Sequence, residues 1–310
     1  MAETRTEFLV GTASWTDPTL VKSDLFYPSY LKSAEERLRF YATQFRTVEV
    51  DSSYYALPSE RNAELWRERT PPGFVFNVKA FAWLTQHPAE TARLPKNIKE
   101  MLTAEQLGEP RLGRPPAKAL DMAFQMFWSA LGPLREGSPG EAGTLGTVLF
   151  QFPPYFTMKP ANFDYLASLP ARMPGASIAV EFRHPSWVAE DPARAETMRF
   201  LREHRLCYVS IDAPADKSIV PSFIDATGEQ AYVRFHGRNR EAWFKRNISA
   251  AERYKYLYSE RELADRSKEI KLLSRRGVRR AFVIFNNCYR NFGILNAATM
   301  ANILKHQEPR

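Results

Sequence analysis

Short apolar runs alternate with segments of helical character along the whole chain, and this alternation is the main structural signal in the sequence. Most of the runs contain few polar residues, which is typical of strands that are buried on both faces of a parallel sheet. The pattern predicts eight strands, at Phe8–Gly11, Thr47–Val50, Phe74–Val78, Thr147–Gln151, Ser177–Glu181, Cys207–Ile211, Ala231–Phe235 and Ala281–Phe285.

The segments between the runs predict helices with recognisable ends. Ser33 and Ser259 are each followed three residues later by a glutamate, which is the spacing of a capping box at a helix start. Two prolines end a helix at Glu60–Arg69, because proline cannot continue a helix, and Gly277 fits the end of another. Further helices are predicted at Ala34–Phe45, Lys118–Leu134, Ala193–His204 and Asn296–Lys305, with another helix start at Ser249.

Eight strand–helix repeats predict an α/β chain with the fold of a (β/α)8 TIM barrel, formed as a single domain over residues 1–310. An open doubly wound sheet is the alternative, but no GxGxxG motif follows the first strand. Residues 91–146 are too many for one ordinary connection. We interpret them as an expanded third βα connection, either a lid over the mouth of the barrel or a passive surface excursion.

The composition is that of an ordinary globular protein, with 44% hydrophobic and 25% charged residues. Cys207 and Cys288 are the only two cysteines, and they form no CxxC pair, which favours a reducing compartment over a disulfide framework. Residues 1–7 are polar, and the sequence has no run of about 18 apolar residues. We therefore expect a cytoplasmic protein without a membrane partner, and the sequence does not indicate its oligomeric state.

The formal net charge is +8, from 43 basic and 35 acidic residues. Such a surplus permits binding to phosphate groups or to nucleic acid without establishing either. Part of it stands just before the last predicted strand, at the end of the barrel opposite the strand carboxyl ends, where we interpret it as surface charge that favours solubility. These residues are Arg275, Arg276, Arg279 and Arg280.

Polar or charged residues end seven of the eight apolar strands. In a TIM barrel the functional site lies at the carboxyl ends of the strands, and packing alone does not demand polar residues there. We predict that these residues form the site; the other interpretation is that each strand turns polar on reaching solvent. The residues are Glu49, Lys79, Gln151, Glu181, Asp212, Arg234 and Asn286.

Four of these residues are candidates for catalysis. Glu49 and Glu181 stand on different strands and can act as acid and base if both point inward, although each can instead neutralise an arginine, a role favoured more for Glu49. Lys79 can form a Schiff base, bind phosphate or pair with a carboxylate. Asp212 completes the catalytic set.

Ligand binding is predicted around three arginines, Arg183, Arg234 and Arg238, because a guanidinium group holds phosphate or carboxylate through paired hydrogen bonds. Aromatic residues near the strand ends can stack on a base or a sugar, or simply pack. They are Trp15, Tyr54, Tyr55, Trp187 and Trp243. The other candidates for ligand binding are Gln151, His184, His236, Asn286 and Asn287.

A metal site is possible on composition but is not the favoured prediction. His184 and His236, together with Glu181 and Asp212, are suitable ligand types, yet neither an HxH nor an HExxH spacing occurs. The sequence indicates no particular cofactor, and no GxSxG motif or Cys/His arrangement indicates a covalent nucleophile.

Several strand-end motifs together resemble the YecE-like family, also called domain of unknown function 72, from about residue 8 to about residue 304. The motifs are Gly11-Thr12-Ala13-Ser14-Trp15, Val48-Glu49-Val50-Asp51-Ser52-Ser53-Tyr54-Tyr55, Gln151-Phe152-Pro153-Pro154, Glu181-Phe182-Arg183-His184-Pro185-Ser186-Trp187, Arg234-Phe235-His236-Gly237-Arg238-Asn239 and Phe285-Asn286-Asn287. The resemblance implies a TIM barrel and no particular reaction. The chain departs from the family at Ala13-Ser14, where Ser-Gly is frequent, and at Asp51, where Asn is frequent.

Three functions remain open at this stage. The favoured one is binding of an anionic, phosphate-bearing ligand at the mouth of the barrel, with hydrolysis of a phosphoester as the reaction if the protein is an enzyme. The second is non-catalytic binding of nucleic acid, which the +8 charge and the aromatic residues suggest. The third is a sugar isomerase or epimerase, by analogy of fold alone.

Overall fold

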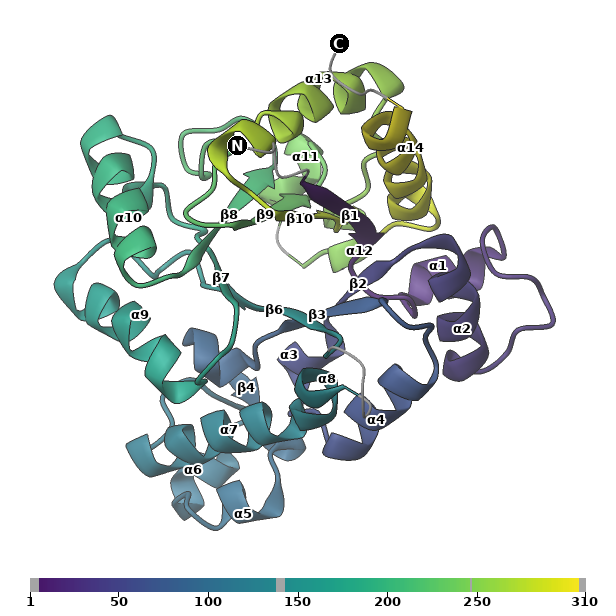
Figure 1. Cartoon of the computed structure of the whole chain (residues 1–310). Helices are drawn as coiled ribbons and strands as arrows, with labels where there is room; N and C mark the ends of the chain where they lie inside the picture. Colours follow the sequence, from purple (N-terminus) through teal and green to yellow (C-terminus); the bar gives the residue numbers. More distant parts are fainter. Residues whose placement is uncertain (1–5, 138–142, 246, 307–310) are drawn as a thin grey trace. The chain divides into compact units, whose positions relative to one another are not determined.

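The structure is a computed structural model that describes residues 6–137, 143–245 and 247–306. The chain divides into two compact units (Figure 1): unit 1 contains Met1–Glu49 and His184–Arg310, and unit 2 contains Val50–Arg183. Eight parallel strands are present, each within two residues of its predicted bounds. The prediction of a single domain stays a prediction.

Unit 1 contains four complete strands that pair in parallel in the order β1-β10-β9-β8. Figure 1 shows β1, in purple, beside β10, so the first strand of the chain pairs with the last. An open doubly wound sheet does not bring these two strands together, whereas a closed barrel does. The α/β fold class with (β/α)8 TIM-barrel topology is therefore confirmed. The strands are β1 (Glu7–Thr12), β8 (Cys207–Asp212), β9 (Gln230–Phe235) and β10 (Arg280–Phe285).

The second strand, β2 (Thr47–Val50), lies beside β1, because Ala13 and Glu49 form a parallel bridge. A Cβ atom added at Gly11 would lie 2.2 Å from the carbonyl oxygen of Thr47. Only glycine permits this close approach of the two backbones.

Three predicted helix starts of unit 1 are confirmed, at Ala34, Ser249 and Ser259, whereas the helices predicted from Ala193 and Asn296 begin earlier, at Asp191 and Phe292. Ser33 and Ser259 form complete capping boxes with Glu36 and Glu262. Gly277 has a left-handed conformation, with φ of 78°, at the end of a short 3-10 helix. The helical segments are α1 (Pro18–Ser23), α2 (Ala34–Gln44), η3 (Pro185–Trp187), α10 (Asp191–Glu203), α11 (Arg240–Trp243), α12 (Ala250–Arg253), α13 (Glu260–Lys271), η4 (Ser274–Arg276) and α14 (Phe292–His306).

Unit 2 contains three strands that pair in parallel in the order β3-β6-β7. They are β3 (Val75–Lys79), β6 (Leu145–Gln151) and β7 (Ile178–Glu181). Three helices of this unit lie outside its long connection: α3 (Ser52–Tyr55), α4 (Glu60–Glu68) and α9 (Pro160–Arg172). The sequence pattern did not predict α9, which contains Pro170 in its last turn.

The connection from β3 to β6 is expanded as predicted, and it contains ordered elements of its own. Strands β4 and β5 form an antiparallel pair, and Trp83 donates from Nε1 to the carbonyl oxygen of Leu112, at 2.8 Å. The elements are η1 (Ala82–Thr85), β4 (Ala89–Glu90), η2 (Thr91–Arg93), α5 (Lys96–Lys99), α6 (Ala104–Gly108), β5 (Arg111–Leu112), α7 (Ala117–Ala130) and α8 (Gly132–Glu136). Residues 138–142 of the predicted connection lie outside the described residues, and a role as a lid stays a prediction.

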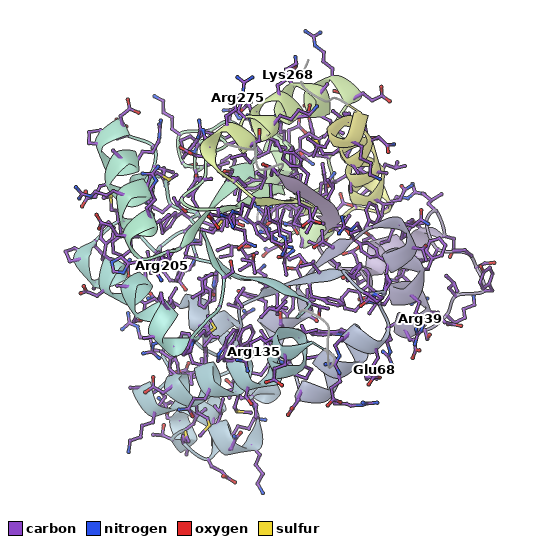
Figure 2. All side chains as sticks on the ribbon, in the orientation of Figure 1. Arg39, Glu68, Arg135, Arg205, Lys268 and Arg275 are labelled. Atoms are coloured by element: carbon purple, nitrogen blue, oxygen red, sulfur yellow. The ribbon has the colours of Figure 1, made fainter. Side chains whose placement is uncertain are left out.

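The charged side chains labelled in Figure 2 are exposed: Arg39, Arg205, Lys268 and Arg275 in unit 1, and Glu68 and Arg135 in unit 2. Both cysteines are free thiols; Cys207 is buried and Cys288 is half-buried. In the part of the chain that the structure describes, no helix has the length and apolar character needed to cross a membrane.

Candidate functional site

The carboxyl ends of the unit 1 strands lie at one level, as the site prediction requires. Backbone hydrogen bonds of 2.8–3.0 Å join the residues just past the strand ends to their neighbours. They run from Ala13 to Phe285, from Ser14 to Glu49, from His236 to Asp212 and from Asn286 to Phe235. The predicted residues of this unit therefore share one end of the sheet.

Two of these residues, Arg234 and Asp212, point to opposite faces of that sheet. Arg234 is in register with Ile211 on β8, and Asp212 is in register with Phe235 on β9. Side chains alternate between faces along a strand, and register partners in neighbouring strands share a face. Asp212 also bonds to Arg266 on α13, so it lies on the side that the helix covers.

On the face opposite Asp212, Glu49 and Arg234 form a fully buried ion pair. Arg234 donates from Nη2 to Glu49 Oε1 at 2.5 Å, and neither side chain has exposed surface. Tyr232 donates from its hydroxyl to Glu49 Oε2 at 2.7 Å. The arginine balances the charge of Glu49, which is the structural role that the sequence left open for this residue.

His236 lies one residue past the end of β9, the strand that carries Arg234, and contacts the side chain of Asn286. The amide Nδ2 of Asn286 lies 2.9 Å from Nδ1 of the imidazole. An amide nitrogen only donates, so Nδ1 of His236 accepts and the ring proton resides on Nε2. The imidazole lies 6.3 Å from the ring of Trp243 and 5.8 Å from that of Tyr254, measured between centroids.

Asp212 is the centre of an ion-pair network on the helix side. Arg238 donates to both carboxylate oxygens, at 2.8 and 2.7 Å. Arg266 and Tyr258 each donate to the carboxylate at 2.7 Å. Burial raises the pKa of Asp212, but the hydrogen bonds and charge of Arg238, with Tyr258 and Arg266, outweigh it and hold the pKa below its usual value. The network supports a structural role for Asp212 and Arg238.

Four other predicted residues of unit 1 make local structural contacts. The indole of Trp15 donates to the carbonyl oxygen of Ala34, at 3.3 Å, and Trp187 is fully buried. The Nδ1 atom of His184 accepts from the backbone of Ser186 and caps η3. Asn287 is fully buried and donates to the carbonyl oxygen of Tyr256 and to the side chain of Asn296. Their predicted ligand-binding roles stay predictions.

In unit 2, predicted residues from three neighbouring strands share one face of the sheet. Gln151 and Glu181 are register partners on β6 and β7. Lys79 on β3 pairs with Leu149, which stands two residues before Gln151 and so points to the same side. Glu181 has no exposed surface, and Arg183, two residues later, approaches its Oε1 with Nε at 2.6 Å.

Lys79 also contacts α3, which follows β2. Its ammonium lies 3.8 Å from Oδ1 of Asp51 and 4.7 Å from the centre of the Tyr54 ring. The hydroxyl of Ser53 donates to the carbonyl oxygens of Val50 and Lys79, at 3.0 and 2.6 Å, and so fixes α3 against the end of β3. Predicted residues Lys79 and Tyr54 are therefore in contact, as a cation over an aromatic ring.

His87, which was not among the predicted site residues, lies beside this group. Its ring contacts that of Tyr54 at 5.4 Å, and its Nδ1 lies 2.8 Å from Oγ1 of Thr85. The Thr85 hydroxyl also lies 3.0 Å from the carbonyl oxygen of Ala82, so Thr85 joins the imidazole to the short helix η1.

Burial and three nearby cations lower the pKa of His87 to about 4, so the imidazole is uncharged at neutral pH. The cations, in decreasing order of effect, are Lys79, Arg183 and Arg111, and we call these three residues the basic cluster. Arg111 lies on β5 in the expanded connection. The expectation that site residues lie at the carboxyl ends of the strands does not predict His87 or Arg111, because both lie within the connection between β3 and β6.

A family model described as protein of unknown function DUF72 matches residues 9–310. The UPF0759 protein YunF of Bacillus subtilis is 31% identical over 283 residues, which are 90% of this chain and 88% of YunF. The UPF0759 protein YecE of Escherichia coli K12 is 25% identical over 206 residues, 66% of this chain and 58% of YecE.

Solved structures agree with the fold and the family. The crystal structure of a DUF72 family protein from Thermotoga maritima has a TM-score of 0.75 and 32% identity, over 97% of this chain and 100% of that protein. A DUF72 family protein from Enterococcus faecalis has a TM-score of 0.73 at 22% identity, over 98% and 100% of the two chains, and supports the fold alone. The protein belongs to the DUF72 family of TIM-barrel proteins, the YecE-like family.

Proposed function

We propose that the protein binds an anionic, phosphate-bearing small molecule at the carboxyl ends of β3, β6 and β7 in unit 2. The observation that carries this proposal is the basic cluster: Lys79 lies over the Tyr54 ring that contacts His87, Arg111 donates to the carbonyl oxygen of the next residue, Pro88, and the charge of Arg183 acts on the same imidazole. The carboxylates of Asp51 and Glu181 are paired with Lys79 and Arg183. A concentration of cations favours an anion, and guanidinium groups suit phosphate oxygens.

The proposed site does not include Arg234 or Arg238, two arginines that the sequence analysis predicted to bind the ligand. Arg234 is fully buried against Glu49, and Arg238 is held by both oxygens of Asp212 and by Glu262. A phosphate at either arginine would have to displace a carboxylate from a buried or half-buried pair, which is costly. Arg183, the third predicted arginine, is also paired with a buried carboxylate, that of Glu181, and we keep it in the proposed site because its charge acts on the same imidazole as those of Lys79 and Arg111.

The reaction we propose is hydrolysis of a phosphate ester. Water attacks phosphorus, the phosphorus–oxygen bond to the alcohol breaks, and the alcohol leaves with one proton. Glu181 is the group we assign to remove a proton from the water, because it lies beside Arg183 on the shared face with Gln151. Lys79 and Arg183 stabilise the charge that develops on the phosphate oxygens.

Thermal-shift and calorimetric titrations with inorganic phosphate, sugar phosphates and short oligonucleotides test the binding proposal. Arg183→Met removes one cation of the basic cluster and also the partner of Glu181, so circular dichroism first checks that the variant is folded. Arg275→Met is the control, because Arg275 is exposed (Figure 2). We expect phosphate-bearing ligands to bind at least about tenfold more weakly to Arg183→Met, a loss typical of a charge-assisted hydrogen bond. Equal affinity in both variants, or no binding to the wild type, would contradict the proposal.

Hydrolysis is tested separately with a panel of phosphate esters. If Glu181 is the base, Glu181→Gln lowers kcat by about 100-fold or more while the ligand still binds. A wild type that binds esters and leaves them intact would restrict the function to binding. Affinity for oligonucleotides alone, falling steeply with salt, would instead favour nucleic acid as the partner.

A further inference from the structure

Two exposed tyrosine rings lie beside the basic cluster of unit 2. Tyr55 is 52% exposed and Tyr155 is 59% exposed, which is unusual for large aromatic side chains. Both belong to the same unit as the cluster, and Arg111 donates to the carbonyl oxygen of Pro88, the residue next to His87, at 3.0 Å. The aromatic and the cationic side chains therefore belong to one region of the unit.

Direct contacts join the ammonium of Lys79 to the exposed ring of Tyr55 through the ring of Tyr54. The ammonium of Lys79 lies over the Tyr54 ring, and the Tyr54 ring meets that of Tyr55 edge-on, with centroids 5.1 Å apart. On its other side, Tyr54 contacts the ring of His87. The Tyr155 hydroxyl donates to the carbonyl oxygen of Gln86, the residue next to His87, at 2.6 Å.

The bond to Gln86 determines what Tyr155 offers to a ligand. The hydroxyl proton is already donated, so the exposed ring presents mainly its apolar and π surface. A sugar hydroxyl gains little from such a surface, whereas a flat aromatic base stacks on it whatever its sequence identity. Cations for a phosphate and a ring surface for a base occur together here.

We propose that the ligand of the basic cluster is a nucleotide, with its phosphate at Lys79, Arg111 and Arg183 and its base stacked on Tyr155 or Tyr55. This inference rests on the proposed anion site and adds the chemical class of the molecule that enters it. The phosphate is attracted by the three cations, and the base covers aromatic surface that is otherwise exposed to water.

The test compares AMP, UMP, ribose 5-phosphate and inorganic phosphate by isothermal titration calorimetry at one ionic strength. We expect the wild type to bind AMP about 5- to 150-fold more tightly than ribose 5-phosphate, the range expected for stacking of one base on an aromatic side chain. UMP should be preferred over ribose 5-phosphate as well, because stacking tolerates different bases.

Three variants test whether Tyr55 and Tyr155 cause the preference for AMP over ribose 5-phosphate. In Tyr55→Ala/Tyr155→Ala the preference for AMP over ribose 5-phosphate should fall to about one, since no ring remains to stack. Tyr55→Phe/Tyr155→Phe keeps both rings, removes the bond to Gln86 and should retain the preference. Tyr30→Ala removes an exposed tyrosine of unit 1 and is the control for a surface ring elsewhere.

The outcomes separate this inference from the anion site itself. If AMP and ribose 5-phosphate bind the wild type equally and both are lost in Arg183→Met, the anion site stands and the nucleotide inference is wrong. A preference for AMP that survives in Tyr55→Ala/Tyr155→Ala also overturns it. If none of the four probes binds the wild type, both proposals fail.

Discussion

At the scale of single residues, burial decides what Glu49 and Arg234 do. Both side chains are fully buried, and each is the other's charged partner. Taking two charges out of water is expensive, and the pair persists only because its geometry and the bond from Tyr232 compensate. Removing one member leaves the other buried without its counter-charge.

We therefore expect Arg234→Met to lower the free energy of unfolding by about 3–5 kcal/mol, because it strands the carboxylate of Glu49. The double variant Glu49→Leu/Arg234→Met should recover most of that loss. Urea denaturation followed by circular dichroism measures both. Arg39→Met is the control, since its partner Glu35 is exposed and such pairs contribute about 1 kcal/mol or less. A single Arg234→Met variant as stable as the control would disprove the structural role.

The backbone of Ser14 has a conformation that is uncommon for residues other than glycine. Ser14 has φ of 67°, a left-handed conformation that glycine adopts at no steric cost. The departure of this chain from the Ser-Gly pair frequent in its family thus falls on a residue that the fold still holds in the glycine conformation. The Ser14 hydroxyl oxygen accepts a hydrogen bond from the Thr16 amide, at 3.1 Å, which partly offsets the strain.

At the scale of elements, the sequence predicted the eight strands because each is an apolar run closed by polar residues. Elements without such a signature were missed: β4 and β5 have two residues each, and α9 carries a proline near its end. The periodicity of hydrophobic residues needs a longer window than two residues. The tertiary contacts that form β4 and β5 come from residues about 20 positions apart.

The expectation that site residues lie at the carboxyl ends of the strands predicted which end of the sheet they share. It did not predict on which face of the sheet each side chain lies. A strand places successive side chains on opposite sides, so the register with its neighbours decides which of two adjacent residues points inward. That register is a long-range property, and it turns Asp212 toward α13 while Arg234 points the other way. Lys79, Gln151 and Glu181 do share one face, as the prediction required.

The Asp212 network ties the end of β8 to α13, and it makes this connection sensitive to acid. Because the pKa of Asp212 in the folded protein lies below its unfolded value of about 3.9, the ionised carboxylate contributes stability above that pH. The contribution is lost as the pH falls through the folded pKa. Asp212→Asn should lower the free energy of unfolding at pH 7 by about 1.5–3 kcal/mol, the range for hydrogen bonds to a charged group.

Urea denaturation of this variant from pH 7 to pH 2 measures the effect, with the exposed Asp164→Asn as control. The gap in stability between Asp212→Asn and wild type should narrow as the pH falls below about 4, because the wild type then loses the same charge. A gap that is constant over this range would show that the carboxylate's charge is not what stabilises the junction.

At the scale of the whole molecule, the net charge of +8 does not by itself locate a site. Three of the four arginines near the start of β10 are paired with acidic residues of the same unit: Arg276 with Asp225, Arg279 with Glu229 and Arg280 with Glu7. This agrees with their interpretation as surface charge. The basic cluster differs because the charges of its cations act on one half-buried imidazole, and they lower the pKa of His87 further than burial, the largest cause, does alone.

The pKa of His87 is therefore the most direct measure of the central claim, that unit 2 holds an anion site at its basic cluster. It can be followed by NMR of the imidazole, assigned with His87→Gln, in the presence and absence of saturating ribose 5-phosphate. Without ligand we expect a pKa of about 4. A bound phosphate offsets the cations and should raise it by at least about one unit toward 6.5, and Arg183→Met should raise it without any ligand.

Arg275→Met, which changes an exposed arginine of unit 1, should leave the pKa of His87 unchanged. The account predicts that the ligand raises the pKa in the wild type and raises it less in Arg183→Met, where one cation of the site is gone. A pKa of His87 that is the same with and without ribose 5-phosphate would contradict the anion site.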